Sequence, residues 1–291
     1  MPSTKIVTGD CLHCLGHLTQ QIDLTFCDPP FNQGHFYRYF NDKQEEHSYW
    51  HWLSEVLSAV RAKTTVGGMI YFMHREKNAE FALSSLRHAG WTFQNLIIWK
   101  KMTSAVPAKN RYGKHYQIII SATNGEKAQV FNKLRIDPPI APNHHQARKN
   151  GIYVTDVWDD IRELTSGYFA GTEPVRTNNG ERFHKQQSPI ALLLRIILSS
   201  SGAGDLVFDP FAGTGTTLVV ANQLNRQSIG VDLDPQNTQC IHKRLNDLRD
   251  CDCVEKFFNY YRYTQDIDKI WGKSHLMIDQ THRSVFLENA S

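Results

Sequence analysis

Short apolar runs rich in β-branched and aromatic residues alternate along this chain with longer runs whose apolar residues recur at helical spacing. The short runs predict strands at Lys5–Thr8, Leu24–Cys27, Met69–Met73, Asn95–Trp99, Tyr116–Ala122, Leu206–Phe208 and Ser228–Val231. The longer runs predict helices at Ser48–Lys63, Lys77–Ala89, Pro189–Ser201, Gly215–Leu224 and Pro235–Leu248. This alternation predicts an α/β fold with a doubly wound, mostly parallel sheet of seven strands.

Two features interrupt the alternation. No helix separates the strands Asn95–Trp99 and Tyr116–Ala122, which are joined by a loop with Pro107 and Gly113. We therefore expect an antiparallel pair at a sheet edge. Residues 124–187 carry several prolines and glycines and little periodicity, so they predict an inserted, loop-rich region rather than another β–α unit.

Composition bounds the class of protein. The chain has 291 residues, of which 41% are hydrophobic, and a mean hydropathy of -0.45, as expected of a globular protein with a sizeable core. It has no apolar run near the roughly 20 residues that span a bilayer, and its N-terminus lacks the apolar segment of a signal peptide. We expect a cytoplasmic protein that has no contact with a membrane.

The six cysteines do not have the spacing of a metal site. Cys11 and Cys14 form a C-x-x-C pair, and Cys251 and Cys253 form a C-x-C pair, but a structural zinc site needs four regularly spaced ligands. We expect reduced thiols and no metal.

The net charge is only +3, but basic residues gather in the middle of the chain. Residues 98–117 contain five lysines and arginines and no acid, and residues 127–155 contain five with Asp137 as the one acid. Such a distribution suits a surface that faces phosphates, and a solvated basic loop would have the same composition.

Two short motifs end strands. Asp28-Pro29-Pro30-Phe31 follows the strand Leu24–Cys27 and forms a stiff turn that holds one carboxylate and one ring. Alone it could be an ordinary loop. The stretch F-A-G-T-G, residues 211–215, follows a strand and Asp209 and leads into a helix. Its glycines let a ligand approach the backbone, and the helix start offers free N–H groups.

A third acid, Asp232, ends the next strand, where acids in such units accept hydrogen bonds from a ribose. It could instead cap the following helix, but Asp234 suits that role better.

In this order the motifs resemble the permuted, beta-class amino-methylating DNA methyltransferases of bacterial restriction–modification type, in which D-P-P-F/Y comes early and F-x-G-x-G late. The resemblance covers most of residues 5–250 and includes "IVTGDCLHCL", "YVTDVWDDI" and "HKQQSPIALLLRIILSSS". His184, Gln187 and Pro189 keep the pattern of the last stretch, but Ser188 stands where the family usually has lysine. Gln117 stands where glutamate is frequent.

The resemblance implies a Rossmann-like domain that binds S-adenosylmethionine. Residues 1–123 would form the catalytic half, 124–187 the target-recognition region, 188–250 the cofactor half and 251–291 a C-terminal tail. The residues it implies at the cofactor are Gly9, Asp10, Cys11, Asp28, Ser188, Asp209, Phe211, Ala212, Gly213, Thr214, Gly215, Thr216, Thr217, Asp232 and Leu233.

The implied reaction methylates the exocyclic amine of a base flipped out of the duplex. Asp28 and the Pro29 carbonyl would accept the two amino hydrogens, Phe31 would stack on the base, and Pro30 would keep the turn rigid. Tyr37 or Phe36 could extend the aromatic wall or belong to the core.

Double-stranded DNA is the implied partner, with a cognate restriction endonuclease and a dimer as further options. The basic residues expected to contact DNA are Lys100, Lys101, Lys109, Arg111, Lys114, His144, Arg148, Lys149 and Arg176. For each of them, phosphate contact or solvation is favoured over base readout.

Several alternatives remain open at this point. Aspartate in the first motif position is commoner in adenine-N6 than in cytosine-N4 enzymes, so adenine is favoured. RNA and protein methyltransferases with a related motif place the cofactor motif first, unlike this chain. An inactive DNA-binding module would not need the intact acids and glycines, and a nicotinamide-dependent oxidoreductase would carry G-x-G-x-x-G.

Overall fold

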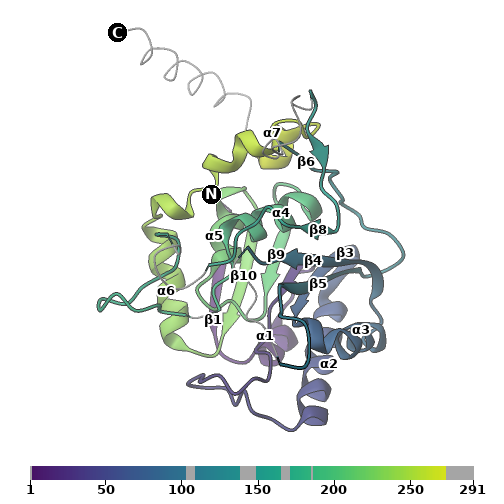
Figure 1. The fold of residues 1–291 in the computed structure, drawn as a ribbon, viewed down its shortest axis with the longest axis vertical. Helices are drawn as coiled ribbons and strands as arrows, with labels where there is room; N and C mark the ends of the chain where they lie inside the picture. The colour runs from purple at the N-terminus through teal and green to yellow at the C-terminus, as the bar shows by residue number, and fades with distance from the viewer. Residues whose placement is uncertain (1, 103–108, 138–148, 165–170, 185, 273–291) are drawn as a thin grey trace.

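The structure is a computed structural model that describes residues 2–102, 109–137, 149–164, 171–184 and 186–272. Its centre is an eight-stranded sheet in the order β1-β10-β9-β2-β3-β5-β4-β8 (Figure 1). The strands are β1 Thr4–Thr8, β2 Ile22–Cys27, β3 Thr64–His74, β4 Thr92–Lys100, β5 Tyr116–Thr123, β8 Val157–Trp158, β9 Leu206–Asp209 and β10 Gln227–Asp232. A separate short ladder pairs β6 (Arg135–Ile136) with β7 (Ile152–Tyr153).

The α/β class and the mostly parallel sheet are confirmed. All seven predicted strands form, and β5 is antiparallel to both β3 and β4, as the missing helix indicated. The predicted edge is corrected, because β8 pairs in parallel with β4 and makes an eighth strand outside it. With only two residues, β8 is too short to give a periodic signal.

Seven α-helices are described: α1 Cys11–His17, α2 Glu46–Lys63, α3 Ala79–His88, α4 Ile190–Ser200, α5 Thr216–Gln223, α6 Pro235–Asn246 and α7 Ile267–Trp271. The five predicted helices correspond to α2 to α6, with ends that differ by a few residues. The sequence did not predict α1, whose seven residues begin after Asp10, and the Asp10 carboxylate caps it by accepting a hydrogen bond from the His13 N–H.

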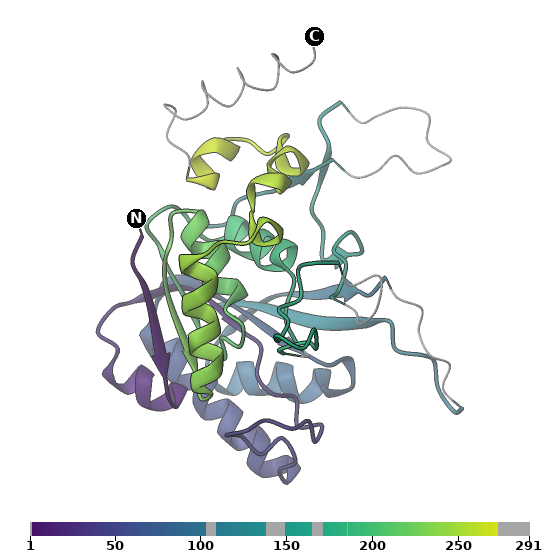
Figure 2. The same ribbon diagram turned by 90° about the vertical axis from the view of Figure 1, so that its left-hand side faces the viewer.

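The helices form two layers. Alternate residues of β3 point to opposite faces of the sheet: Ile70 and Phe72 pack with α1, α2 and α3, whereas Met69 and Tyr71 pack with α4 and α5. Figure 2 shows the blue helices α2 and α3 on one side of the sheet and the green helices on the other. Both faces of the sheet are thus buried, as parallel sheets require.

The segment after α6 packs on the α4 side. It contains the 3₁₀ turns Asp250–Asp252 and Glu255–Tyr261 followed by α7, and it buries Tyr261 and Trp271 in the core. The buried Arg195 of α4 pairs with Asp160, which also accepts a hydrogen bond from the Tyr260 hydroxyl. The sequence alone predicts no more for this segment than a C-terminal tail packed on the domain.

Residues 124–187 hold β6, β7 and β8, and no helix occurs in the described part of this region. The boundaries at 124 and 187 stay predictions. Within the described residues, the cysteines are free, no cluster of three or more His, Cys, Asp or Glu could hold a metal ion, and no helix is long and apolar enough to span a membrane.

Strand order places the chemistry of the sequence motifs along one edge of the sheet. The neighbours β1, β10, β9 and β2 run in parallel, so their carboxyl ends lie together. At these ends stand Gly9, Asp232, Asp209 and Asp28. The crevice outside the carboxyl ends of such strands is where open α/β sheets bind ligands.

Candidate active site

A cavity of about 500 Å³ opens at this edge of the sheet. All four residues of the D-P-P-F turn line it, and so does every residue predicted at the cofactor except Gly215. Phe36 and Tyr37, the candidates for an aromatic wall, also line it, and further wall comes from residues that the sequence did not indicate: His35, Arg38, Tyr39, Phe40, Thr177, Arg182 and Phe183. The structure therefore brings the two motifs together from opposite ends of the chain.

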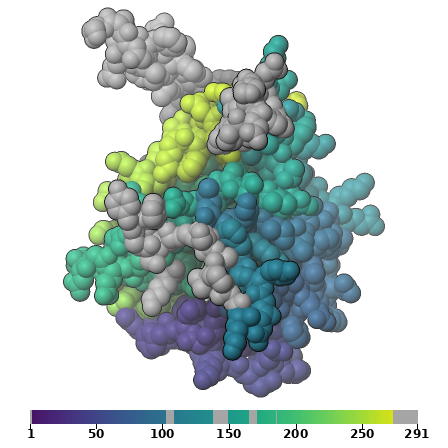
Figure 3. All heavy atoms as spheres, in the orientation of Figure 1, coloured from purple at the N-terminus to yellow at the C-terminus, as the bar shows by residue number. Residues whose placement is uncertain are grey.

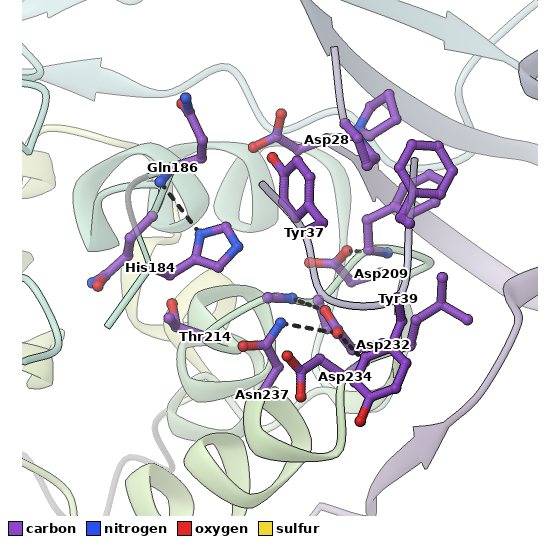
Figure 4. Close-up of a pocket in the computed structure, with 18 of the residues that line it drawn as sticks. Asp28, Tyr37, Tyr39, His184, Gln186, Asp209, Thr214, Asp232, Asp234 and Asn237 are labelled. Atoms are coloured by element: carbon purple, nitrogen blue, oxygen red, sulfur yellow. Dashed lines mark hydrogen bonds between the residues drawn. The ribbon is translucent and has the colours of Figure 1, made fainter. Parts of the chain in front are cut away.

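Two carboxylates shape the glycine loop between β9 and α5. Asp209 accepts hydrogen bonds from the Phe211 N–H at 3.0 Å and from the Thr217 hydroxyl at 2.5 Å. Asp232 accepts hydrogen bonds from the N–H of Gly213 at 2.8 Å and from the Asn237 amide at 2.9 Å, as Figure 4 shows. The loop is therefore held from both sides.

Asp232 also accepts a hydrogen bond from the Asp234 N–H, whereas Asp234 itself caps α6 through the Gln236 N–H. The prediction that Asp234 is the helix cap is confirmed. Burial raises the pKa of the Asp232 carboxyl, although a carboxylate with three donors still has acceptor capacity for a ligand.

The two loop glycines differ in what surrounds them. Gly213 has φ of +52°, and a Cβ there would meet nothing closer than the Phe211 carbonyl oxygen at 3.9 Å. Gly215 has φ of +77°, and a Cβ there would lie 2.6 Å from the Ile241 side chain of α6. Gly213 thus leaves the backbone open to the cavity, whereas Gly215 allows two helices to pack.

This difference gives a prediction about stability. We expect Gly215→Ala to lower the free energy of unfolding by about 2–4 kcal/mol, because a strained φ adds to a clash in packed surroundings. Gly213→Ala should cost about 1 kcal/mol, since only the backbone conformation opposes it. Urea denaturation of both variants measures the difference, and equal losses would contradict this account of the loop.

Asp28 lies at the end of β2, on the cavity wall. Its carboxylate accepts a hydrogen bond from the Ser188 hydroxyl at 3.4 Å. Burial raises the pKa of Asp28 to about 8, with a further contribution from the charge of Asp209, whose own pKa burial raises to about 7. Close carboxylates in a poorly solvated cavity disfavour each other's charge, which favours a cation as ligand.

A buried polar chain holds the D-P-P-F turn from behind. The Tyr49 hydroxyl of α2 donates a hydrogen bond to the Pro30 carbonyl at 2.7 Å and lies 3.0 Å from His74 Nε2. His74 Nδ1 accepts a hydrogen bond from the Arg75 N–H, so Nε2 carries the proton and donates to Tyr49. Burial lowers the pKa of His74 to about 3, which keeps the ring neutral.

Phe31 packs on the same histidine. Its ring centroid lies 4.9 Å from that of His74, and the residue is only 8% exposed. Tyr49 and Phe31 thus both contact His74, and the three side chains together support the turn. Tyr49 and His74 were not predicted from the sequence, because they follow Pro30 by 19 and 44 positions and share no motif with it.

The loop between β2 and α2 is ordered by a buried acid that the sequence did not single out. Asp42 accepts hydrogen bonds from the N–H groups of Asn32, Gln33 and His35. Tyr37 is half-buried and points into the cavity near Asp28 and Asp209 (Figure 4). Phe36 is 90% exposed at the cavity mouth, so it is not a core residue. The purple N-terminal segment that includes this loop forms the lower part of the face in Figure 3.

The residues predicted to contact DNA do not share one environment. Lys101 differs most from a solvated cation: its amine lies 3.2 Å from the centre of the Trp99 ring, and burial lowers its pKa to about 7. Lys114 pairs with Glu76 at 2.8 Å. The exposed members are Lys100, Lys109, Arg111, Lys114, Lys149 and Arg176. His144 and Arg148 lie outside the described residues, and all these contacts stay predictions.

The family model described as "DNA methylase", of the N6/N4 type, matches residues 22–243. The chain is 30% identical over 261 residues to the DNA adenine methyltransferase YhdJ of Escherichia coli K12, covering 83% of this chain and 82% of that protein. It is 29% identical over 255 residues to the type II methyltransferase M.BamHI of Bacillus amyloliquefaciens, covering 83% of this chain and 56% of the relative.

Solved structures share the fold. The M1.HpyAVI–SAM complex superposes with a TM-score of 0.56 at 20% identity, covering 84% of this chain and 99% of that one. The cytosine-N4-specific PvuII DNA methyltransferase gives 0.61 at 17% identity and covers 94% of this chain and 96% of its own. With a family match across most of the sheet and a relative at 30% identity over most of both chains, this protein belongs to the N6/N4 family of DNA methylases.

Proposed function

We propose that the protein methylates the N6 amine of adenine in double-stranded DNA with S-adenosylmethionine as the methyl donor. The observation that carries the proposal is the shared cavity, in which Asp28 of the D-P-P-F turn faces the glycine loop. Adenine is favoured because the aspartate is the form commoner in adenine enzymes and because the relative YhdJ is named an adenine methyltransferase.

The residues present fit this cofactor. The cavity contains Asp28, Asp209 and Asp232, each with a raised pKa, and S-adenosylmethionine carries a sulfonium and an ammonium. Gly213 leaves its backbone open for close approach, and Asp232 ends the strand where a ribose diol would be accepted. Gly9, Asp10 and Cys11 line the same cavity and would flank the adenine ring. When bound, the cofactor supplies an electrophilic methyl group.

The residues of the D-P-P-F turn hold the amine. An exocyclic amine is a poor nucleophile because its lone pair is delocalised into the ring of the base. Hydrogen bonds from the amine to Asp28 and the Pro29 carbonyl would localise that pair, and the rigid turn avoids reorganisation during the reaction. The nitrogen must lose one proton as it gains the methyl group, and the Asp28 carboxylate accepts it at a pKa near neutrality.

Aromatic side chains would hold the flipped base and exclude water. Tyr37 lines the cavity close to Asp28, and Phe31 contributes the small part of its ring that His74 and its neighbours leave open. Base flipping costs a few kcal/mol of lost stacking and pairing, which contacts of this kind offset. Backbone contacts would come from the exposed basic residues and from the region 124–187.

Digestion of the DNA product to nucleosides, followed by mass spectrometry, tests the function. Purified protein is incubated with unmodified bacterial DNA and S-adenosylmethionine, with Asp28→Ala as control. N6-methyladenine confirms the proposal. N4-methylcytosine would show that the target base is cytosine and would leave the proposed active site unchanged. Absence of methylation on duplex DNA, single-stranded DNA and RNA would contradict the proposal.

The type II names of two relatives support a cognate endonuclease as partner, and such a nuclease should fail to cut DNA modified by this protein.

Loss of one hydroxyl behind the turn should slow the reaction. We expect Tyr49→Phe to lower kcat about tenfold, because the Pro30 carbonyl loses its donor and the turn loses part of its preorganisation. The KM for S-adenosylmethionine should not change. Trp91→Phe, which removes a buried donor to the Leu57 carbonyl outside the cavity, is the matched control. Equal kcat values for the two variants would remove Tyr49 from the catalytic support.

Asp232→Ala should weaken cofactor binding. We expect its Kd for S-adenosylmethionine to rise about 10–100-fold, since a charge-assisted hydrogen bond to the ribose and the Gly213 N–H anchor are both lost. Glu45→Ala, which removes the side-chain cap of α2 at the Ser48 N–H and lies outside the cavity lining, serves as control. Isothermal calorimetry gives both values, and an unchanged Kd for Asp232→Ala would contradict the ribose assignment.

A further inference from the structure

One arginine of the cavity wall has no role in the proposed reaction. Arg182 lines the cavity and belongs to a short hairpin, where its backbone forms an antiparallel β-bridge with that of Arg176. Backbone hydrogen bonds from Thr177 N–H to Glu181 O and from Phe183 N–H to Val175 O, both 2.8 Å, fix the hairpin. Two residues on, His184 also lines the cavity, where Figure 4 shows it facing the Asp232 side. The arginine is thus held at the site by ordered backbone.

Only one edge of its guanidinium has a partner. Nη1 donates to the Leu164 carbonyl at 3.0 Å. Nε and Nη2 are buried and have no hydrogen-bond partner among the residues that the structure describes. These two nitrogens lie on the same edge of the planar group, and their N–H bonds run in parallel. That edge matches the two oxygens of a carboxylate or phosphate, the geometry of bidentate recognition by arginine.

The positive charges near Arg182 also favour an anionic ligand. Burial lowers the pKa of Arg182, and so does the positive charge of Arg176. In turn, Arg182 contributes to the lowered pKa of His184. Leaving buried donors unpaired is unfavourable, so native proteins seldom keep them without a reason. A negative ligand would relieve both the unpaired edge and the repulsion between the arginines.

We propose that Arg182 binds an oxyanion of the substrates through Nε and Nη2. Two sources share this chemistry: the carboxylate of the methionine part of S-adenosylmethionine, and a phosphate of the DNA strand that carries the target base. The inference rests on the proposed function for the identity of these ligands, but the unpaired edge of the guanidinium is independent of it. Arg182 is a binding residue and takes no part in moving protons.

The experiment separates the two sources. Arg182→Gln and Arg182→Lys are compared with the wild type by calorimetry with S-adenosylmethionine and with its decarboxylated analogue. Binding of a labelled duplex is then measured at several salt concentrations. Arg61→Gln is the matched control, because Arg61 of α2 also has a buried Nε without a partner in the described part of the chain but does not line the cavity.

If the cofactor carboxylate is the ligand, Arg182→Gln should raise the Kd for S-adenosylmethionine about tenfold or more and leave that of the decarboxylated analogue unchanged, as loss of a charged bidentate pair predicts. If a phosphate is the ligand, cofactor affinity stays the same, DNA affinity falls and the salt slope decreases by about 1. Arg182→Lys should keep part of either effect, since it retains the charge but not the fork.

Unchanged affinity for both ligands in a variant with the thermal stability of the wild type would overturn the proposal. A wild type that binds no S-adenosylmethionine would instead contradict the proposed function, and the DNA titration would still decide the role of Arg182. An equal loss of affinity in Arg61→Gln would also overturn the proposal, because it would trace the effect to lost packing of any buried arginine.

Discussion

Alanine in place of Asp28 should lower kcat by about 10²–10⁴-fold, the range expected when a general base and an electrostatic contact are removed together. The cofactor should still bind, because the glycine loop is shaped by Asp209 and Asp232 rather than by Asp28. Single-turnover methylation of duplex DNA measures the chemical step, and calorimetry measures the binding.

Asp205→Ala is the control for this loss. Burial also raises the pKa of Asp205, but this residue sits at the opposite end of β9, where it accepts a hydrogen bond from the Gly202 N–H. Turnover of Asp28→Ala close to that of Asp205→Ala, with intact cofactor binding, would refute the catalytic assignment.

Cofactor affinity should rise with pH, with the steepest change between about pH 6 and 8. Asp28 and Asp209 have folded pKa values of about 8 and about 7, so both hold protons in the empty protein over part of this range. A cationic ligand favours the carboxylate forms, so binding releases protons. The affinity then increases by up to about tenfold per pH unit for each proton released.

Calorimetry in buffers of different ionisation enthalpy counts the released protons. Asp28→Asn should remove one of them and flatten the upper part of the profile. Affinity that is independent of pH, or that falls as pH rises, would contradict this reading of the cavity.

The stability of the empty protein should change in the opposite direction. The folded pKa of Asp28 lies above its value in the unfolded chain, so the unfolded state loses this proton first as pH rises. The contribution of Asp28 to stability is therefore lost between about pH 4 and pH 8. Thermal melts of wild type and Asp28→Asn should show the variant gaining stability relative to the wild type over that interval.

The sequence predicted the elements that have a strong period and missed those too short to show one. Strands such as Leu24–Cys27 and Leu206–Phe208 are apolar on both faces because helices cover both, and that pattern is visible in one dimension. The two residues of β8 are defined by their pairing with Ile98 and Trp99, which no local signal records. The cap at Asp10 was the one available clue to α1.

The same limit applies to the site. Motifs located Asp28, Gly213 and Asp232, because their roles depend on neighbours in sequence. The support at Tyr49 and His74 and the unpaired edge of Arg182 depend on contacts across the fold, so composition and spacing could not reveal them. Lys101 shows the same limit: composition placed it among the basic residues expected to contact phosphate or solvent, but could not show that its side chain lies against Trp99.

The strand order also determines when each strand can meet its partner as the chain emerges from the ribosome. Among the described strands, β1 pairs with β10 alone, and β2 pairs with β3 on one edge and with β9 on the other. A nascent chain emerges at about 5–20 residues per second, so β3 reaches β2 early, whereas β1 and the other edge of β2 wait for tens of seconds until β9 and β10 leave the ribosome. During that interval β1 and one edge of β2 have no partner strand. Neither half should acquire the site alone, because Asp28 and Asp209 become neighbours only when the two ends of the polypeptide meet.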